Sequence, residues 1–383
     1  MYKAEKLAEV SDNPGIVWKS AKAFMGWTSP GTPSQIKVKN DLITSAKEIA
    51  RHMNEYFIQK VLAIRSSMQA AYFSISTVRS IMKNKKCKLQ LSHINVGKVQ
   101  KILKSLSSSR STSIDELDNY SLKLAAEYIT LPIHHILCLS IIQSRFPQSW
   151  KYSKVLPLHK KDDKLDLKNY RPVSILSPVS KIVEKVVYEQ IYEYFTRNNL
   201  FHPNLHGYRG NRSTQTALLQ MYDRWVRAAH GEGHGQQGQL SGVVLLDLSA
   251  AFDIVDHSLL LQKLKVYGFD ECFLAWVESY LTNRHQAVWI DHALSPFISC
   301  PAGVPQGSNL GPLFFLIFYN DLPYSVDCSV DAYADDSTMT VTGRTMEEIG
   351  SKLTESCQVV SDWMVGNRLK LNANKTQWVQ IQG

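Results

Sequence analysis

The feature that most constrains this chain is an apolar run that ends in a carboxylate. Residues 243–246 read Val-Val-Leu-Leu and are followed by Asp247. Four apolar, partly β-branched residues predict a buried strand. An Asp at the end of such a strand is costly unless it is paired or bound to a metal ion. Ser249 and Asp256 are better placed to cap the next helix, so Asp247 needs another role.

A second acidic site follows, where residues 330–341 form two strand-like runs around Asp335 and Asp336. This pattern predicts a tight β-hairpin with both acids at its tip. Taken alone, an Asp-Asp pair is an ordinary turn, and the turn is the favoured interpretation of this stretch by itself. Together with Asp247, however, the pair can converge to hold two divalent cations. Two such ions stabilise the attacking and leaving oxygens of an in-line phosphoryl transfer.

Between these acids lies a turn-forming segment, residues 302–308, which contains Pro305 and Gly307. Pro and Gly favour a turn here, and the following helix at 310–321 is apolar on nearly all sides and therefore expected to be buried. A close backbone approach at Gly307 would let a nucleotide or a template–primer lie against the loop. A tight loop without a ligand is the alternative, and these residues leave both open.

Charge and composition narrow the class of protein. The formal charge of +9 favours a polyanionic partner, either nucleic acid or an acidic membrane, although an ordinary basic enzyme also fits. The six cysteines are spread out without a CxxC pair, which is typical of reduced intracellular thiols. The N-terminus lacks the apolar region of a secretory peptide. The longest apolar run, 310–319, is too short to span a bilayer, so an integral membrane protein is not expected.

The first 110 residues predict a partly helical leader. After Trp150 the sequence pattern changes to short strand-like runs that alternate with helical ones, which predicts a mixed domain. The spacing of apolar residues predicts helices at 41–61, 96–106, 115–144 and 178–194. Within 115–144, Pro132 either interrupts the helix or opens a second one. A strand is expected at 155–158, a turn-rich linker at 28–33 and a flexible loop at 231–238. The basic cluster from Lys83 to Lys88 is expected to be a solvated loop, with phosphate contact as the minority interpretation.

Six segments resemble, in order, the motifs of reverse transcriptases, with a Pro-Gln-Gly core and a Tyr-Ala-Asp-Asp box among them. They are residues 156–161 with 169–175, 206–214, 247–257, 303–321, 333–336 and 367–376. The segments at 169–175 and 247–257 most resemble the polymerases of non-LTR (LINE-type) retrotransposons. The resemblance covers about residues 140 to 383, and the preceding part is similar to the region that joins that family's endonuclease to its polymerase. His206 departs from the Gln that the family more usually has there.

The resemblance implies an α+β fold of the right-hand polymerase type. Residues 1–139 would be an N-terminal helical extension or linker, and 140–383 the reverse transcriptase domain. Within that domain the fingers would cover 140–240, and the palm, with a ferredoxin-like antiparallel sheet backed by helices, would cover 241–383. No thumb is expected before Gly383, so weak, salt-sensitive binding and short synthesis are expected.

The resemblance also implies roles for individual residues. Catalytic and metal-binding acids would be Asp247, Asp335 and Asp336, and Lys375 would protonate the pyrophosphate leaving group. The incoming dNTP would be bound by Lys160, Arg171, Phe252, Gln306 and Gly307. Phe252 would select deoxynucleotides by clashing with a ribose 2′-OH, with core packing as the alternative. Arg209 and Arg212 would contact template phosphates.

The implied function is RNA-directed DNA synthesis with two Mg²⁺ ions, for which Mn²⁺ is a possible substitute. The expected partners are an RNA template, a DNA primer and dNTPs, without a membrane, and the expected location is the nucleus or the cytoplasm. The oligomeric state stays open. An RNA-dependent RNA polymerase is disfavoured by Phe252. A decayed retrotransposon fragment that only binds nucleic acid remains the alternative.

Overall fold

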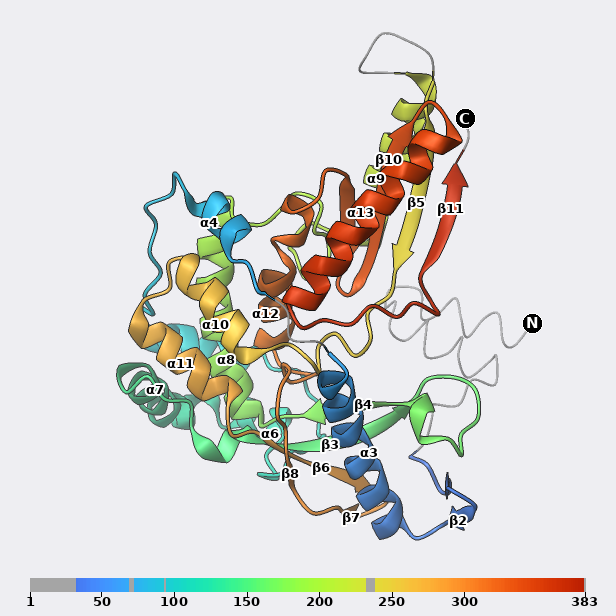
Figure 1. Cartoon of the computed structure of the whole chain (residues 1–383). Coiled ribbons are helices and arrows are strands. Elements are labelled where there is room, and N and C mark those ends of the chain that lie inside the picture. Colours follow the sequence, from blue (N-terminus) through green and yellow to red (C-terminus); the bar gives the residue numbers. More distant parts are fainter. Residues whose placement is uncertain (1–31, 69–71, 93, 232–237, 382–383) are drawn as a thin grey trace, which may run out of the picture.

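The computed structural model describes residues 32–68, 72–92, 94–231 and 238–381. Helices are combined with two main β-sheets, so the predicted mixed α+β class is confirmed. Figure 1 shows one sheet in the upper part of the molecule and the other in the lower part, with a group of helices beside and between them. The two sheets therefore form two separate layers, an upper one and a lower one.

The upper layer is a four-stranded antiparallel sheet made by the C-terminal part of the chain. In spatial order its strands are β11 (Gln377–Ile381), β5 (Leu240–Leu246), β10 (Asp336–Gly343) and β9 (Ser329–Tyr333). Helix α13 (Met346–Gly366) packs on one face, where Gly242 leaves room for Ile349. Helix α9 (Thr214–His230) packs on the other face, where Arg224 pairs with Asp331. Both predicted strand regions, 243–246 and the hairpin at 330–341, are confirmed.

The lower layer joins segments that are far apart in the sequence. Its strands are β4 (Tyr170–Ile175), β3 (Tyr152–His159), β6 (His285–Ile290), β7 (Ala293–Leu294) and β8 (Ile298–Ser299). The strand predicted at 155–158 is confirmed and is longer than expected. Because β3 pairs in parallel with β6, this sheet contains strands from both sides of residue 240. The predicted division there stays a prediction, but it does not separate one sheet from the other.

The N-terminal helix is built into the lower layer. The helix predicted at 41–61 is observed as α3 (Ala46–Ser66), which starts later because β2 (Asp41–Ile43) pairs with β1 (Ile36–Val38). The buried Asn54 side chain donates to the carbonyl oxygens of Gln286 and Pro296 at 3.2 and 2.9 Å. Burying an amide is favourable only when its hydrogen bonds are made, so Asn54 fixes α3 against β6.

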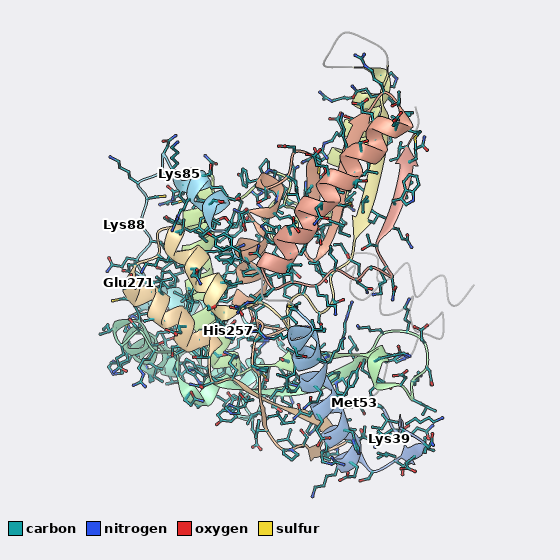
Figure 2. The ribbon with its side chains drawn as sticks, viewed as in Figure 1. Lys39, Met53, Lys85, Lys88, His257 and Glu271 are labelled. Carbon is teal, nitrogen blue, oxygen red and sulfur yellow. The ribbon has the colours of Figure 1, made fainter. Side chains whose placement is uncertain are left out.

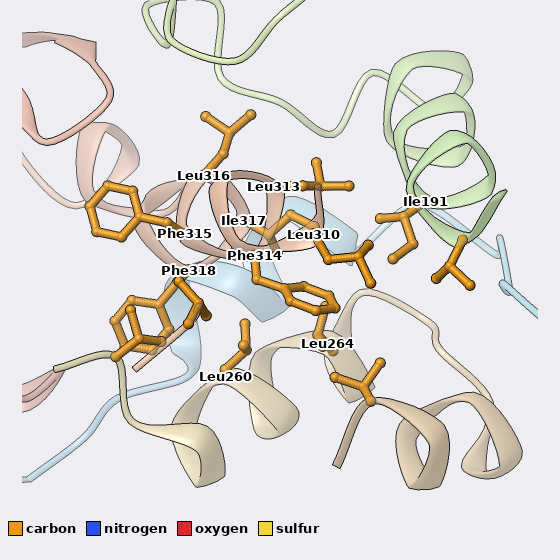
Figure 3. Packing of buried hydrophobic residues seen from close by; sticks show 14 of the residues in the cluster. Ile191, Leu260, Leu264, Leu310, Leu313, Phe314, Phe315, Leu316, Ile317 and Phe318 are labelled. Carbon is orange, nitrogen blue, oxygen red and sulfur yellow. The ribbon is translucent and has the colours of Figure 1, made fainter. Parts of the chain in front are cut away.

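The core is centred on helix α12 (Leu310–Tyr319), which is buried on every side as predicted. Figure 3 shows its apolar side chains meeting Leu260 and Leu264 on one side and Ile191 on another. Those contacts come from α10 (His257–Val266) and α8 (Pro178–Arg197), and α11 (Glu271–Leu281) completes the helical layer. The helix ends at Tyr319 rather than at Asp321, which forms a buried ion pair with Lys263 at 2.5 Å.

The remaining elements are short helices around this core. They are α4 (Ser76–Met82), α5 (Val96–Lys104), α6 (Asn119–Leu124), α7 (Ala126–Ile142) and the 3-10 turns η1 (Gln148–Lys151), η2 (Leu167–Asn169) and η3 (Leu322–Tyr324). The segment predicted to be helical at 115–144 contains α6 and α7, and α7 continues through Pro132. Most of the linker expected at 28–33 and of the loop expected at 231–238 lies outside the described residues.

The basic cluster at 83–88 is only partly a solvated loop. The Lys85 ammonium group donates to the carbonyl oxygens of Asn198 and Asn199 at 2.6 and 2.8 Å, at the C-terminal end of α8, where a helix favours a cation. Figure 2 places Lys85 and Lys88 at the edge of the molecule, beside α4. All six cysteines are free. Within the described ranges, no helix has the length and apolar character needed to cross a bilayer.

Candidate active site

The three predicted acids lie at one end of the upper sheet. Ser337 of β10 pairs with Leu246 of β5, so the next antiparallel pair brings Asp336 beside Asp247. Asp335 precedes them in the tight turn between β9 and β10, where Ala334 has a φ of 61°. The register of the sheet, rather than any long-range loop, therefore brings these carboxylates together.

The charges of the neighbouring acids affect the pKa of Asp336. The pKa of Asp336 is raised above its ordinary value, first because partial burial disfavours the charged form and then because the charges of Asp335 and Asp247 repel it. Arg171 and Lys375 oppose this effect because their positive charges favour the carboxylate. Asp336 is therefore repelled by the two neighbouring acids, and the positive charges of Arg171 and Lys375 partly offset that repulsion.

Two further residues hold Asp247 from the segment after α13. The Asn372 amide nitrogen donates to Asp247 Oδ2 at 2.9 Å, and the Lys375 ammonium lies 3.5 Å from the same oxygen. The backbone nitrogen of Asn372 also donates to the Asp247 carbonyl oxygen at 2.8 Å. Lys375 was predicted to belong to the site. Asn372 was missed, although it lies in the same segment, because its hydrogen bond to Asp247 joins residues that are far apart in the sequence.

The donor set suits a hard divalent cation. Mg²⁺ is bound by carboxylate oxygens together with water and substrate phosphates rather than by an all-protein cage. Three mutually repelling carboxylates at one sheet end match that chemistry, because a cation between them relieves the repulsion. Among the described residues, no group of three or more His, Cys, Asp or Glu side chains is placed to hold a metal ion.

The turn-forming segment lies next to the acids and is held by backbone contacts. Gly307 has a φ of 112°, and a Cβ atom there would lie 2.4 Å from the Ser174 carbonyl oxygen of β4. The Ser174 nitrogen donates to the Gln306 carbonyl oxygen at 2.9 Å. Gly303 likewise has a φ of 84° and lies against the Asp253 backbone. Only glycine fits both positions without strain, so this loop is clamped between β4 and the segment after β5.

Phe252 is partly buried beside the acids, as part of an aromatic group. Its ring stacks on Phe315 of α12 with a centroid separation of 4.5 Å and meets the edge of Tyr208 at 6.1 Å. The Asp335 charge raises the pKa of Tyr208, although burial of that phenol is the larger cause. Tyr208 was not predicted as a site residue, and it is placed there because its own loop lies against the β9–β10 hairpin.

That loop approaches the hairpin very closely. The His206 nitrogen donates to the Ala332 carbonyl oxygen at 2.8 Å, and a Cβ atom on Gly207 would lie 2.2 Å from the Ala334 nitrogen. Arg209 donates from Nη1 to the carbonyl oxygens of His202 and Leu205 at 2.9 and 3.2 Å. The Arg209 guanidinium thus closes its own loop. Its predicted contact with template phosphates stays a prediction, as does that of Arg212.

A cleft opens on the other side of the turn-forming segment. It is lined by Lys60, Pro172, Ser174, Asp253, Arg284 and Gln306 together with apolar neighbours. Gln306 donates from Nε2 to Asp253 Oδ1 at 2.5 Å. Burial raises the pKa of Asp253 and is the largest effect. The hydrogen bond from Gln306 and the positive charges of Lys60 and Lys160 lower this pKa, but by less. Asp253 was not assigned a role although it lies in the segment 247–257, and Lys60 was missed because it lies in the N-terminal part of the chain, outside the motifs.

The two predicted nucleotide-binding cations belong to this neighbourhood. The pKa of Lys160 is lowered, first by burial and then by the positive charges of Lys60, Arg171 and Lys375. Arg171 is exposed on β4, and its charge acts on Asp336 as well. The predicted cations Lys160 and Arg171 therefore lie within electrostatic reach of Lys375 and of Asp336, respectively, while Gln306 lines the cleft together with Lys60 and Asp253.

Comparison with known proteins agrees with this arrangement. The family described as reverse transcriptase (RNA-dependent DNA polymerase) matches residues 158–382. A probable RNA-directed DNA polymerase from transposon BS of Drosophila melanogaster is 27% identical over 85% of this chain and 36% of its own length. The RNA-directed DNA polymerase from the mobile element jockey of the same species is 26% identical over 75% of this chain and 32% of its own length.

The chain spans about a third of the length of these curated relatives. The family match covers more than half of the chain and contains the acids, the turn-forming segment and the cations Lys160, Arg171 and Lys375. The resemblance to polymerases of the non-LTR type is confirmed by the relatives' names. The chain belongs to the reverse transcriptase family.

Proposed function

We propose that this chain is the polymerase core of a non-LTR retrotransposon and copies RNA into DNA. The reaction is attack of a primer 3′-OH on the α-phosphate of a dNTP, directed by an RNA template. The observation that carries the proposal is the meeting of Asp247 and Asp336 in adjacent strands, next to Asp335 and to a group of cations. The site needs acids to bind the positively charged metal ions, and it needs cations to bind the negatively charged triphosphate.

The two layers correspond to parts of a right-hand polymerase. In this proposal the upper sheet, with α13 and α9 on its faces, is the palm, and the sheet that contains β3 and β4 belongs to the fingers. Helix α3 and the segments before residue 140 form the N-terminal extension. Because α3 is fixed to β6 through Asn54, α3 is a structural part of the fingers in this proposal.

The acids would act through divalent cations. Asp247 and Asp335 would hold two Mg²⁺ ions, or Mn²⁺ as a substitute, with Asp336 supporting them electrostatically. When bound, such ions lower the charge at the attacking and leaving oxygens of the phosphoryl transfer. The hydrogen bond from Asn372 keeps one Asp247 oxygen oriented. Lys375, which is 3.5 Å from that oxygen and largely exposed, would give a proton to the departing pyrophosphate.

Substrate selection would follow from the residues around the acids. Phe252 is fixed by its stacking on Phe315, so its ring cannot easily move away from a ribose 2′-OH. Lys160 and Arg171 would bind the triphosphate as charge-assisted donors. Gln306 and Gly307 would line the nucleotide and template pocket, with Gly307 held against the Ser174 carbonyl oxygen of β4, where a side chain has no room. Arg209 and Arg212 would lie near template phosphates.

Primer extension tests the proposal directly. The purified chain is given poly(rA)/oligo(dT), dTTP and Mg²⁺, and single-nucleotide addition is measured by gel. We expect addition by the unmodified chain and at least a thousandfold loss, on the order of 4 kcal/mol of activation free energy, in Asp335→Asn.

The matched control is Asp223→Asn, which removes an exposed acid of α9 that pairs with Arg227 at 2.9 Å. Its rate should equal that of the unmodified chain. Binding of the template–primer without any addition would favour the alternative, a fragment that only binds nucleic acid. Equal rates in Asp335→Asn and the unmodified chain would refute the assignment of the acids.

A further inference from the structure

One cation in the cleft comes from a part of the chain that the polymerase motifs do not include. Lys60 lies in the last two turns of α3, before Arg65. Its side chain is partly buried and lines the cleft together with Pro172, Asp253 and Gln306. The apolar face of the same helix, with Phe57 and Val61, is buried. The helix is therefore firmly placed, and Lys60 extends from it into the nucleotide side of the site.

Lys60 has no strong partner of its own. Its ammonium group makes no hydrogen bond and no ion pair within 4 Å with any residue in the described part of the chain. By contrast, Arg65 on the same helix pairs with Asp256 at 3.0 Å, and Arg51 pairs with Glu48 at 2.7 Å. A partly buried cation without a partner costs solvation free energy, which a bound anion would recover.

Lys60 also adds to a group of like charges. Lys160 lies within electrostatic reach of Lys60, Arg171 and Lys375, and each of these three charges disfavours its protonated form. Asp253, the acid that lines the cleft, is already hydrogen-bonded to Gln306. Lys60 also lines the cleft, and its charge acts with those of Arg171 and Lys375 on Lys160, so an anion of several charges would stabilise this group of cations. A nucleoside triphosphate carries that charge in one compact group, whereas a nucleic acid backbone offers one charge per phosphate.

We propose that Lys60 of α3 binds the phosphates of the incoming nucleoside triphosphate, so that the N-terminal helix forms one wall of the nucleotide pocket. This inference rests on the proposed polymerase function and extends it to a residue outside the motifs. The triphosphate lies between Lys160 and Arg171 on the sheet and Lys60 on the helix. Lys60 acts by binding and positioning the substrate and takes no part in proton transfer.

The test is a single-turnover titration with dTTP on poly(rA)/oligo(dT) in Mg²⁺. The dTTP concentration at half-maximal rate should rise about tenfold, which is about 1.4 kcal/mol, in Lys60→Gln. The maximal rate should change by less than about threefold, since the substitution removes a binding contact. Lys60→Arg keeps the charge and should restore most of the affinity. Inhibition by tripolyphosphate should weaken by the same factor in Lys60→Gln.

The matched control is Lys47→Gln, an exposed lysine near the start of the same helix. Gln and Lys have similar helix propensities, so both variants should keep the thermal midpoint of the unmodified chain. An unchanged dTTP requirement in Lys60→Gln overturns the inference. A loss confined to template–primer affinity also overturns it, because the cation would then face nucleic acid.

The proposed function can fail separately. If the unmodified chain adds no nucleotide, tripolyphosphate binding measured by calorimetry still decides the role of Lys60. Weaker binding in Lys60→Gln than in Lys47→Gln supports the anion site, and equal binding in the two variants removes it.

Discussion

The acidic and the cationic sides of the site are built in different ways. Asp336 begins β10, Asp247 directly follows β5 and Asp335 lies in the turn before β10, so the register of one sheet fixes their spacing. The cations come from separate segments: Lys60 from α3, Lys160 and Arg171 from the end of β3 and from β4, and Lys375 from the chain before β11. The acids thus depend on one local unit, whereas the cations depend on the packing of the whole molecule.

This difference has a functional consequence. A two-metal reaction needs its carboxylates at fixed separations, which a regular sheet supplies. The triphosphate is a flexible, highly charged group, and long lysine and arginine side chains can reach it from several elements. We therefore expect substitutions on the acidic side to abolish the reaction. Substitutions on the cationic side should mainly weaken nucleotide binding, and those at the clamped loop between the two sides should affect both.

Apart from the acids themselves, the clamped loop gives the largest expected effect on the rate. Gly307→Ala places a Cβ atom 2.4 Å from the Ser174 carbonyl oxygen at a φ of 112°, so the loop must move. A shift of about 1 Å at a positioning element can cost on the order of a hundredfold in rate. We expect a loss of that size in single-turnover dTTP addition, together with a higher dTTP requirement.

The control for this change is Gly350→Ala in α13, where an added Cβ atom meets nothing within 4 Å. Replacing a helical Gly by Ala should raise stability by roughly 0.5–1 kcal/mol and leave the rate unchanged. A Gly307→Ala variant as active as Gly350→Ala would show that the two sides of the site do not depend on this loop.

A smaller effect is expected at the aromatic group beside the acids. Phe252→Val removes the ring that is proposed to face the sugar and keeps a β-branched apolar side chain next to Phe315. We expect the preference for dTTP over UTP to fall about tenfold, since steric exclusion in a pocket is worth that much or more. Rates of dTTP and UTP addition, measured side by side, test this. Phe297→Val, at a 40% exposed ring elsewhere, is the control, and an equal ratio in both variants would mean that Phe252 only packs the core.

The acidic side could be predicted from sequence because its information is local. Alternating and apolar runs around Asp247 and Asp335 identify strands, and the register of a hairpin follows from its short turn. The apolar helix after the Pro-Gln-Gly loop was found for the same reason. The strands and the hairpin are determined by neighbours in the chain, whereas the pairing of β5 with β10 joins segments far apart, and the meeting of Asp247 with the hairpin was predicted from the chemistry and the motif resemblance.

The cationic side could be predicted only in part. Lys160 and Arg171 were found through motif resemblance, whereas Lys60, Asp253 and Asn372 were missed. Lys60 reaches the site because α3 packs against β6, a contact between residues more than two hundred positions apart, as for Asn54 and Gln286. The late start of α3 was missed as well, because the pairing of β2 with β1 overrides the helical spacing there. Tertiary contacts of this kind leave no periodic trace in the sequence.

The central claim is that the acids at the end of the upper sheet hold the divalent cations of the reaction. Its most direct test is Mn²⁺ binding, followed by electron paramagnetic resonance, in a complex of the chain with poly(rA), a dideoxy-terminated primer and dTTP. The account predicts about two tightly held ions per chain, loss of at least one in Asp247→Asn and no change in Asp223→Asn. The same number of bound ions in Asp247→Asn as in the unmodified chain would contradict it.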